Sequence, residues 1–413
     1  MAEIHPFPAV LFRPEEGTDV TPFVAPPYDV ITPAERIALP KRSPYNVIRL
    51  TLPEAPPDGD RYQAAAKLFQ SWIQSGILYT VTTPALYVWE QEFRHVDTTY
   101  RRRALVAKVT CEPYRPGCVM RHEYTYPAPK EDRLRLFRAT GAQFSQIFGI
   151  FEDDQGEVSS LLAEMVGQTP WQTARGDDGH ISRLFNITDE KVIKRFQAGL
   201  HDRTVIIADG HHRYETSVAY YQQLGRKGTT LMTLVPSSDP GLIVLPTHRT
   251  LGLSLSAQAF CQALGDEFSI EAHPLESWPR LHRQTASHSA GGIILAAATP
   301  IDQSFWIKWK NKSGARSRSV NQTRGQSDVV VFHENILPRL TATGSADPGT
   351  FGYFHEAEEA VAAARAQGHW AFLLRPTSVR VLLNVAKYEE VLPAKSTYFY
   401  PKFLAGFINA RLD

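Results

Sequence analysis

The sequence contains little cysteine, no long apolar run and almost no net charge, and each of these absences excludes a class of protein. Three cysteines in 413 residues are too few for a disulfide framework, and Cys111 and Cys118 lack the second pair that a zinc ribbon requires. The longest apolar stretch of note, Ile293 to Ala298, is far shorter than the ~18–20 residues of a membrane span. The 44 basic and 43 acidic residues nearly cancel, so no overall field attracts nucleic acid or an anionic membrane.

Several familiar sequence signatures are also missing. Glu3, His5 and three early prolines interrupt any apolar core of a signal peptide. There is no Gly-x-x-x-x-Gly-Lys-Ser/Thr loop, no Gly-x-Gly-x-x-Gly after a strand and no Gly-x-Ser-x-Gly elbow, which leaves the P-loop, dinucleotide-binding and α/β-hydrolase classes unsupported. We expect a soluble, cytoplasmic protein with no nucleic-acid partner and no membrane partner, and the sequence does not indicate its oligomeric state.

What is present is an ordinary globular composition, with 43% hydrophobic and 21% charged residues, in a chain long enough for two or three domains. Strand-like and helix-like segments intermingle without strict alternation, which predicts a mixed α+β fold rather than a doubly wound sheet. The main predicted strands are 47–52, 86–93, 103–110 and 204–208, of which the middle two form a hairpin.

Local signals also predict helices and one long loop. Thr32 is a helix N-cap, with Pro33 at the first helical position and Glu35 completing a capping box. Apolar spacing predicts a second helix over 61–75. The polar run 311–326 contains no large apolar residue, so it is predicted to be an exposed loop.

The most informative segment is a strand, turn and helix around Asp209. Gly210 permits a tight turn, and the start of a helix is a site for anions because its N–H groups are exposed at the positive end of the dipole. His211, His212 and Arg213 add donors that suit phosphate. The Asp209 carboxylate would face the same pocket, where it could hold Mg²⁺ or orient a histidine. The alternative is that Asp209 is only a helix N-cap and the histidines lie on the surface.

A second candidate is the pair His122 and Glu123. Glu123 has the chemistry of a general base, and His122 or Arg121 would adjust its pKa. The alternative interpretation is a solvated loop followed by a charged helix face.

Two further segments carry polar groups of the types used in phosphate chemistry. Lys395, Ser396 and Thr397 can donate to phosphate oxygens, but a strand end with satisfied hydroxyl groups is an equal alternative. His248 and Arg249 follow a predicted strand, and their side chains are as compatible with a structural role as with a functional one.

Seven motifs occur in an order that resembles one family. They are Ala-Pro-Pro-Tyr-Asp-Val-Ile (25–31), Pro-Tyr-Asn-Val-Ile-Arg-Leu (44–50), His-Glu-Tyr-Thr (122–125), Lys-Glu-Asp-Arg-Leu-Arg-Leu (130–136), Asp-Gly-His-His-Arg-Tyr-Glu-Thr (209–216), Leu-Pro-Thr-His-Arg (245–249) and Lys-Ser-Thr-Tyr-Phe-Tyr-Pro-Lys (395–402). Over essentially the whole chain, the pattern resembles the bacterial and archaeal family known as domain of unknown function 1015, whose name implies no activity.

A remoter resemblance is to the free L-serine kinases of the ParB/sulfiredoxin superfamily. Those kinases carry an Asp-Gly-His-His-Arg turn after a strand, an upstream His-Glu pair and a Pro-Lys-Thr-Thr-like segment near the C-terminus. The matching residues here are Asp209 to Arg213, His122 with Glu123, and Ala394 to Thr397, where Ala394 replaces the proline. The resemblance implies a ParB/sulfiredoxin-like mixed-sheet core with additions. The predicted division is an N-terminal α+β region with the hairpin (1–110), the core (111–250), an inserted α/β region (251–345) and a C-terminal segment that returns to the core (346–413).

The same resemblance implies a kinase that uses ATP or ADP, with Mg²⁺, to phosphorylate a small hydroxylated metabolite such as free L-serine. It assigns catalysis to Glu123 as the base, together with His122 and Asp209. The magnesium ligand that we predict from the turn itself is Asp209. The residues assigned to the nucleotide and its phosphates are Gly210, His211, His212, Arg213, Lys395, Ser396 and Thr397. Apart from the resemblance, we predict that the substrate contacts Tyr28, Asp29, Arg133, His248 and Arg249.

The superfamily also supplies the alternatives. Sulfiredoxins place a cysteine directly after the glycine of the turn, where this chain has His211, which argues against reduction of a sulfinic acid. ParB proteins bind DNA through a basic helix pair, which is not evident here. A non-catalytic module that senses a nucleotide or phosphate is the remaining alternative, and the presence of Glu123 counts against it.

Overall fold

The computed structural model describes residues 2–12, 18–57, 59–125, 127–167, 169–286, 293–298, 301–310 and 327–412. Contacts between residues divide the chain into two compact units. Unit 1 comprises Met1–Arg121, Thr125–Ile243 and Pro401–Asp413, and unit 2 comprises His122–Tyr124 and Val244–Tyr400. The finer division into four parts stays a prediction.

Unit 1 is built on a large mixed sheet. Its strands lie in the order β3, β10, β11, β5, β6, β13, β9, β12 and β7, and β1 pairs with β6. The antiparallel pair of β5 (Leu86–His95) and β6 (Thr98–Cys111) confirms the predicted hairpin, with a shorter turn than predicted. The other strands are β1 (Ile4–His5), β3 (Thr18–Asp19), β7 (Val119–Met120), β9 (Ile147–Phe151), β10 (Gln172–Arg175), β11 (Ile181–Ile187), β12 (Val205–Asp209) and β13 (Gly228–Pro236).

One face of this sheet is covered by two helices, α5 (Glu157–Met165) and α6 (Glu190–Leu200). Because successive side chains of a strand point to opposite faces, Leu105 and Val109 of β6 lie on the same face and share a buried cluster with Phe196 of α6. This cluster is the main apolar core of the unit.

The other face of the sheet holds aromatic rings from the C-terminal segment. The ring of Trp89 lies 4.9 Å from that of Phe403 and 4.5 Å from that of Phe407, between centroids. The Gln91 amide donates a hydrogen bond to the backbone carbonyl of Lys402 (3.2 Å). These contacts fix the backbone of Lys402 against the sheet.

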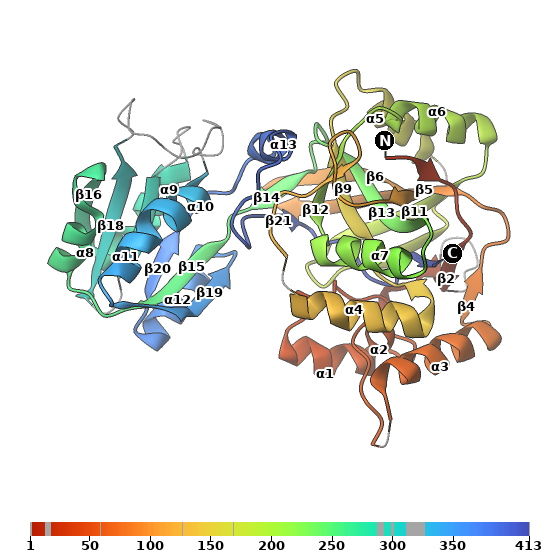
Figure 1. The fold of residues 1–413 in the computed structure, drawn as a ribbon, viewed down its shortest axis with the longest axis horizontal. Coiled ribbons are helices and arrows are strands. Elements are labelled where there is room, and N and C mark those ends of the chain that lie inside the picture. The colour runs from red at the N-terminus through yellow and green to blue at the C-terminus, as the bar shows by residue number, and fades with distance from the viewer. Residues whose placement is uncertain are drawn as a thin grey trace. The chain divides into compact units, whose positions relative to one another are not determined.

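Five helices of unit 1 form a second group, which Figure 1 shows as two layers, with α1, α2 and α3 on the far side of α4 and α7 from the sheet. α4 packs against both α7 and α3. The bounds are α1 (Pro33–Arg42), α2 (Ile48–Thr51), α3 (Arg61–Gln74), α4 (Pro127–Thr140) and α7 (His211–Gln223).

Two of these helices begin where the sequence predicts. The Thr32 hydroxyl oxygen accepts from the Glu35 N–H (3.2 Å), and the Glu35 carboxylate accepts from the Thr32 N–H (2.7 Å), which confirms the capping box. The helix predicted over 61–75 is α3, and the Asp60 carboxylate caps it by accepting from the Tyr62 N–H (2.7 Å).

The strand predicted at 47–52 is wrong, because most of these residues form the short helix α2. Asn46 favours the helix. Its amide donates to the carbonyls of Pro22 and Val24 at 2.9 Å each, and its side-chain oxygen accepts from the Ile48 N–H at 3.0 Å. The apolar residues that suggested a buried strand are therefore buried on a helical turn instead.

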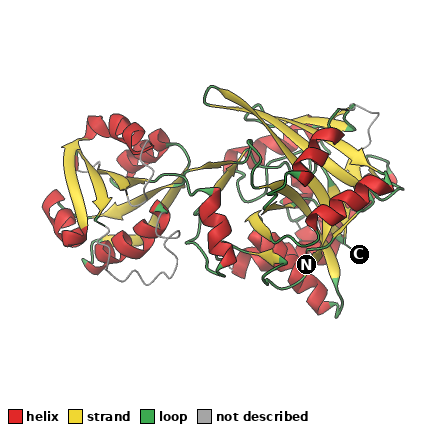
Figure 2. Ribbon diagram, turned by 90° about the horizontal axis from the view of Figure 1, so that it is seen from above, coloured by secondary structure: helices red, strands yellow, loops and turns green. Residues whose placement is uncertain are grey.

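A smaller sheet of unit 1 has the order β4 (Leu78–Thr80), β2 (Ala9–Phe12), β22 (Asn409–Arg411) and β8 (Ala142–Gln143). Because β2 pairs with β22, segments from both ends of the chain share this sheet. Figure 2 marks the two termini, and both belong to unit 1.

Unit 2 is built on a separate sheet with the strand order β16, β18, β17, β20, β15 and β19. Figure 2 shows its helices on the outside of its strands. Its core includes Phe260, whose ring lies 4.4 Å from that of Trp370 and 5.3 Å from that of Phe305, between centroids. The strands are β15 (His248–Leu253), β16 (Phe268–Pro274), β17 (Ile293–Ala298), β18 (Gln303–Trp309), β19 (Ala346–Phe354) and β20 (Trp370–Leu373). The helices include α8 (Ala257–Leu264), α9 (Trp278–Ala286), α12 (Ala357–Gln367) and α13 (Val379–Lys387).

The helix predicted at 328–340 is interrupted in the structure. α10 (Asp328–Val331) continues through the π-helical turn Phe332–Ile336 into α11 (Leu337–Ala342). Pro338 provides the reason, since a proline cannot donate to the carbonyl four residues before it. The loop predicted at 311–326 lies outside the described residues.

The mixed character of the fold is confirmed, and its assignment to the ParB/sulfiredoxin-like class stays a prediction. Within the described ranges, no helix combines the length and apolar character that crossing a bilayer requires. A short ribbon of β14 (Ile243–Leu245) and β21 (Tyr398–Tyr400) completes the described sheets.

Candidate functional site

The turn after β12 has the predicted geometry of strand, glycine and helix. β12 ends at Asp209 and α7 begins at His211, with Gly210 between them at φ 92° and ψ 30°. Any other residue at position 210 would have to adopt this left-handed backbone conformation. Its Cβ would also lie only 2.9 Å from the Cζ atom of Arg213. Only glycine satisfies both conditions. The helix N-cap is thus Gly210 rather than Asp209, and it has no side chain to occupy the first N–H groups of the helix.

Asp209 lies between two cations. Its Oδ2 accepts from Arg213 Nη2 at 2.6 Å, and its Oδ1 accepts from Lys402 Nζ at 2.8 Å. The three side chains are 19%, 6% and 12% exposed, respectively. Burial alone would raise the pKa of Asp209, but the ammonium of Lys402 and the guanidinium of Arg213 hold it well below its usual range. These contacts bring one carboxylate together with two cationic side chains.

Arg213 is the most constrained member of this cluster. Besides Asp209, its guanidinium donates to Ser145 Oγ (2.8 Å) and to the carbonyl of Gln146. These bonds turn the guanidinium toward the protein, so the phosphate contact predicted for Arg213 stays a prediction. Of the two histidines, His211 is 8% exposed and His212 is partly exposed, so they are not both surface residues.

Lys402 is the residue that the sequence interpretation missed. It closes the motif 395–402, but its partner Asp209 is 193 positions away in the sequence. A signal was nevertheless present, because a carboxylate at the end of a buried strand requires a cation, and Lys402 is a basic residue of the motif 395–402 that was given no role.

The magnesium role predicted for Asp209 does not fit this arrangement. Both carboxylate oxygens already accept charge-assisted hydrogen bonds from cations. Among the residues that the structure describes, no group of three or more His, Cys, Asp or Glu side chains could hold a metal ion. The cations beside Asp209 in this structure are the Lys402 ammonium and the Arg213 guanidinium.

Glu215, one turn further along α7, holds the neighbouring chain segments. Its carboxylate accepts from Lys130 Nζ (2.8 Å) and from Thr125 Oγ1 (2.8 Å), and it lies 4.0 Å from the Arg121 guanidinium. Arg121 and Thr125 are the residues that flank the segment His122–Tyr124 of unit 2. Glu215 therefore contacts the residues of unit 1 that precede and follow this segment in the chain.

The substrate residues predicted in unit 1 have different surroundings. The Arg133 guanidinium is buried, donates to the Thr51 carbonyl (2.7 Å) and to Asp132 (2.7 Å), and has no exposed face for a ligand. Its Cζ lies 4.2 Å from the centre of the Tyr28 ring. Burial raises the pKa of Tyr28 to about 12, with the Asp29 charge adding to burial and the charges of Arg213 and Arg133 opposing it. No hydrogen-bond partner of the Tyr28 hydroxyl occurs in the described part of the chain, and Asp29 is exposed.

In unit 2, the His-Glu pair meets the C-terminal motif. His122 is fully buried, and its Nε2 shares a hydrogen bond of 3.0 Å with Thr397 Oγ1. The Glu123 carboxylate accepts from the backbone N–H of Lys395 (3.0 Å). The Leu392 N–H donates to the His122 carbonyl (2.7 Å). Two motifs more than 260 residues apart in the sequence are therefore in contact.

Arg249 joins the same group. It is fully buried, and its Nη2 donates to the Lys395 carbonyl (2.8 Å), while its Nη1 donates to the Thr247 carbonyl. Burial lowers the pKa of Arg249 to about 10, and the charges of Tyr353 and Glu123 oppose that shift. The Nε–H of this guanidinium has no hydrogen-bond partner within the described residues.

His248 has a structural environment. Its Nδ1 accepts from the Leu374 N–H (3.1 Å) and its ring packs edge to face on His282. Burial lowers the pKa of His248 to about 3, helped by the neighbouring His282 and Arg249. A histidine in this state is neutral at physiological pH and suits a packed interior.

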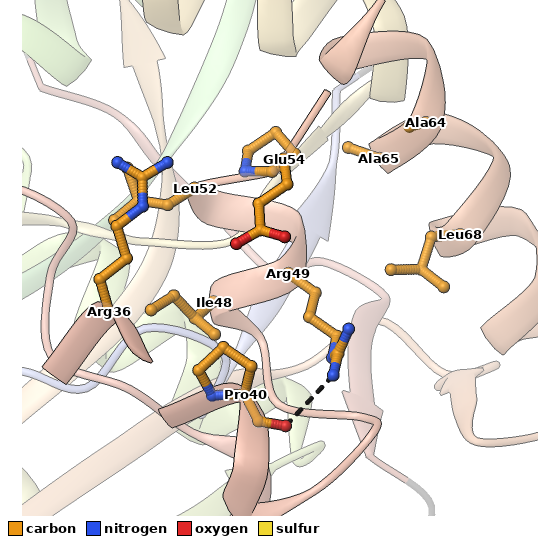
Figure 3. A pocket seen from close by; sticks show the side chains of 10 residues that line it. Arg36, Pro40, Ile48, Arg49, Leu52, Glu54, Ala64, Ala65 and Leu68 are labelled. Atoms are coloured by element: carbon orange, nitrogen blue, oxygen red, sulfur yellow. Dashed lines mark hydrogen bonds between the residues drawn. The ribbon is translucent and has the colours of Figure 1, made fainter. Parts of the chain in front are cut away.

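A pocket of about 160 Å³ lies among α1, α2 and α3 of unit 1 (Figure 3). Its floor is apolar, with Ile48 and Leu68, and Arg36, Arg49 and Glu54 stand around it. Arg49 donates to the Pro40 carbonyl (3.2 Å). None of the predicted site residues lines this pocket.

Comparison with known proteins gives a family but no activity. No curated protein matches the chain. A mutant free serine kinase in complex with AMP aligns at 13% identity over 68% of this chain and 83% of that chain, with a TM-score of 0.36. A conserved hypothetical protein from Pyrococcus furiosus aligns at 14% identity over 71% and 90% (TM-score 0.34), and C-terminally truncated SbnI from Staphylococcus aureus aligns at 10% identity over 70% and 82% (TM-score 0.35). The model of the family described as protein of unknown function (DUF1015) matches residues 4–341, which is most of the chain, and this protein therefore belongs to that family.

Proposed function

We propose that this protein is a nucleotide-dependent phosphotransferase that uses ATP or ADP to phosphorylate a small hydroxylated metabolite, with free L-serine as the first candidate. The observation that carries the proposal is the cluster of Asp209, Arg213 and Lys402 at the start of α7. Its two cationic side chains are combined with a helix N-terminus that begins directly after a glycine. Together these features favour the phosphate groups of a nucleotide.

Phosphoryl transfer needs a cradle for the phosphates, a cation for the charge that develops and a group that positions the attacking hydroxyl. The turn at Gly210 supplies the cradle in this proposal. Lys402 supplies the cation that the sequence interpretation assigned to magnesium on Asp209. Glu123 is proposed as the base on the strength of its motif, since a carboxylate can take the proton as the alcohol attacks. Lys395 is proposed as a further donor to phosphate.

Tyr28 is the best supported of the proposed substrate residues. Its hydroxyl keeps its proton over the whole physiological range, because its pKa is raised to about 12, so it can donate a hydrogen bond. The charge of Arg213 acts on this hydroxyl, which associates Tyr28 with the Asp209 cluster. We propose that it orients the hydroxyl group or carboxylate of the metabolite.

The alternative function is a module that binds a nucleotide or phosphate without catalysis. The observation that favours it is the engagement of both Asp209 oxygens by cations, because most kinases hold a metal ion at such a carboxylate. Under this alternative the site at the start of α7 only binds the nucleotide or phosphate, and Glu123 has no role in proton transfer.

One experiment separates these functions. The purified protein is titrated with ATP and ADP by calorimetry, and then incubated with each nucleotide, Mg²⁺ and a panel of small alcohols that includes L-serine, with products followed by ³¹P NMR. Binding together with a new phosphate ester supports the phosphotransferase. Binding without any product supports the sensing module, and absence of binding contradicts both.

A further inference from the structure

The backbone of Lys395 has an unusual conformation. Its φ is 59°, in the left-handed region that favours glycine. Asparagine and aspartate reach this region with help from their short polar side chains, but lysine has no such help. A lysine stays in this conformation only when surrounding groups hold it there.

Two charged side chains hold this residue at both ends of its backbone. The N–H of Lys395 donates to the Glu123 carboxylate (3.0 Å), and its carbonyl accepts from the Arg249 guanidinium (2.8 Å). Arg249 is itself immobilised, because it is fully buried in β15 and also donates to the Thr247 carbonyl. Bonds of this charge-assisted type are the strong class of protein hydrogen bonds, so the left-handed turn is fixed from two sides.

The residues after Lys395 are turned inward. Ser396 is buried, and its hydroxyl donates to the Pro393 carbonyl. The Thr397 hydroxyl is bonded to His122. Lys395 is instead exposed, and no partner of its ammonium occurs among the residues that the structure describes. Of the three predicted donors, Lys395 alone is presented for a ligand.

We propose that Glu123 and Arg249 form a clamp on the Lys395 backbone, which presents the Lys395 ammonium to a phosphate group of a ligand. Glu123 and Arg249 are then positioning residues, and the function of the clamp is to reduce the freedom that Lys395 loses when it binds. The identity of the ligand rests on the proposed function, whereas the clamp itself rests only on the contacts within unit 2.

The first test is a calorimetric titration of the full-length protein with ADP. Lys395→Ala is expected to weaken binding about tenfold, the usual scale for one charge-assisted bond. Glu123→Ala is expected to weaken it several-fold, and Glu123→Gln to restore it, because an amide oxygen still accepts from the Lys395 N–H. Lys387→Ala, at an exposed lysine at the end of α13, is the matched control and is expected to bind as the unmodified protein does.

The ADP affinity of a double variant distinguishes the clamp from a purely structural role of Glu123. In the double variant Glu123→Ala with Lys395→Ala, the clamp has no ammonium left to present, so ADP affinity should equal that of Lys395→Ala alone. Arg249→Lys keeps the buried charge and one donor, and it should bind ADP between the levels of the unmodified protein and Lys395→Ala. Independent, multiplying losses in the double variant, or a Glu123→Ala variant that binds normally, would overturn the proposal.

A second test does not depend on any nucleotide. Lys395→Gly relieves the left-handed strain, so we expect its melting temperature to rise by about 2–4 °C. A fall in melting temperature would show that the backbone is not held as described and would overturn the clamp. If the unmodified protein fails to bind ADP, the proposed function is wrong, and the melting temperature of Lys395→Gly still decides for or against the clamp.

Discussion

Lys402→Met tests the charged cluster at the start of α7 most directly. Methionine keeps a long unbranched side chain and removes the ammonium that lies 2.8 Å from Asp209. Asp209 would keep its bond with Arg213 at 2.6 Å, so its charge is not left without any partner. The loss should therefore be that of one charge-assisted hydrogen bond, about 1.5–3 kcal/mol, rather than the roughly 3–5 kcal/mol of a buried charge stripped of its only partner.

We thus expect Lys402→Met to lower the free energy of unfolding by about 2 kcal/mol at pH 7, measured by urea denaturation with tryptophan fluorescence. The ring of Trp89 packs on Phe403, next to Lys402, so this tryptophan, one of seven in the chain, contributes to the signal from the region of the substitution. Lys67→Ala, at an exposed lysine of α3, should change stability by no more than about 0.5 kcal/mol and serves as the control.

The pH dependence of the stability difference between the unmodified protein and Lys402→Met gives a second test, in which the direction of the change is also predicted. The pKa of Asp209 is held below its usual range in the folded protein, so the stability that it contributes is present above the unfolded value of about 3.9 and is lost as the pH falls through the folded value. Removing Lys402 raises the folded pKa. The difference between the two proteins should be full above about pH 5 and should narrow as the pH falls through the raised folded pKa of Asp209 in the variant. Equal stabilities at pH 7, or a difference that widens in acid, would refute the reasoning.

Three further predictions concern the other candidate residues. Arg213→Ala should weaken nucleotide binding by at least ~1.5 kcal/mol, or about tenfold, in a calorimetric titration, and unchanged affinity would show that Arg213 does not act on the phosphates. Glu123→Gln keeps the size of the side chain and removes its charge, so nucleotide should still bind while turnover falls about 10²-fold or more; full activity in the ³¹P assay would end its assignment as the base. His248 is neutral in the folded protein, with a pKa of about 3, whereas in the unfolded chain it takes up a proton below about pH 6.5. The free energy of unfolding should therefore decrease as the pH falls from about 6.5 toward 3. His248→Asn keeps an acceptor for the Leu374 N–H and should flatten this part of the stability profile of unit 2, which circular dichroism at stepped pH measures.

The sequence alone was sufficient where neighbouring residues decide the structure. The capping box at Thr32 depends on two residues three positions apart, and the hairpin of β5 and β6 follows from alternation on both sides of a short turn. The turn at Gly210 belongs to the same class, because its left-handed backbone is a property of one residue. Residues 47–52 show the limit of such signals, since the side chain of Asn46 reaches back to Pro22 and Val24 and favours a helix where the local pattern favours a strand.

The partners of the candidate residues were decided only by the tertiary structure. Nothing near Asp209 in the sequence reveals that Lys402, 193 positions away, would occupy one of its oxygens, and with Arg213 on the other oxygen the predicted magnesium ligand is an ion-paired carboxylate in this structure. The left-handed backbone of Lys395 has the same origin, because it is held by Glu123 and Arg249 rather than by its own side chain. The type of a polar residue shows what chemistry it offers, but its partners and its protonation depend on charges that only the folded chain brings within a few ångströms.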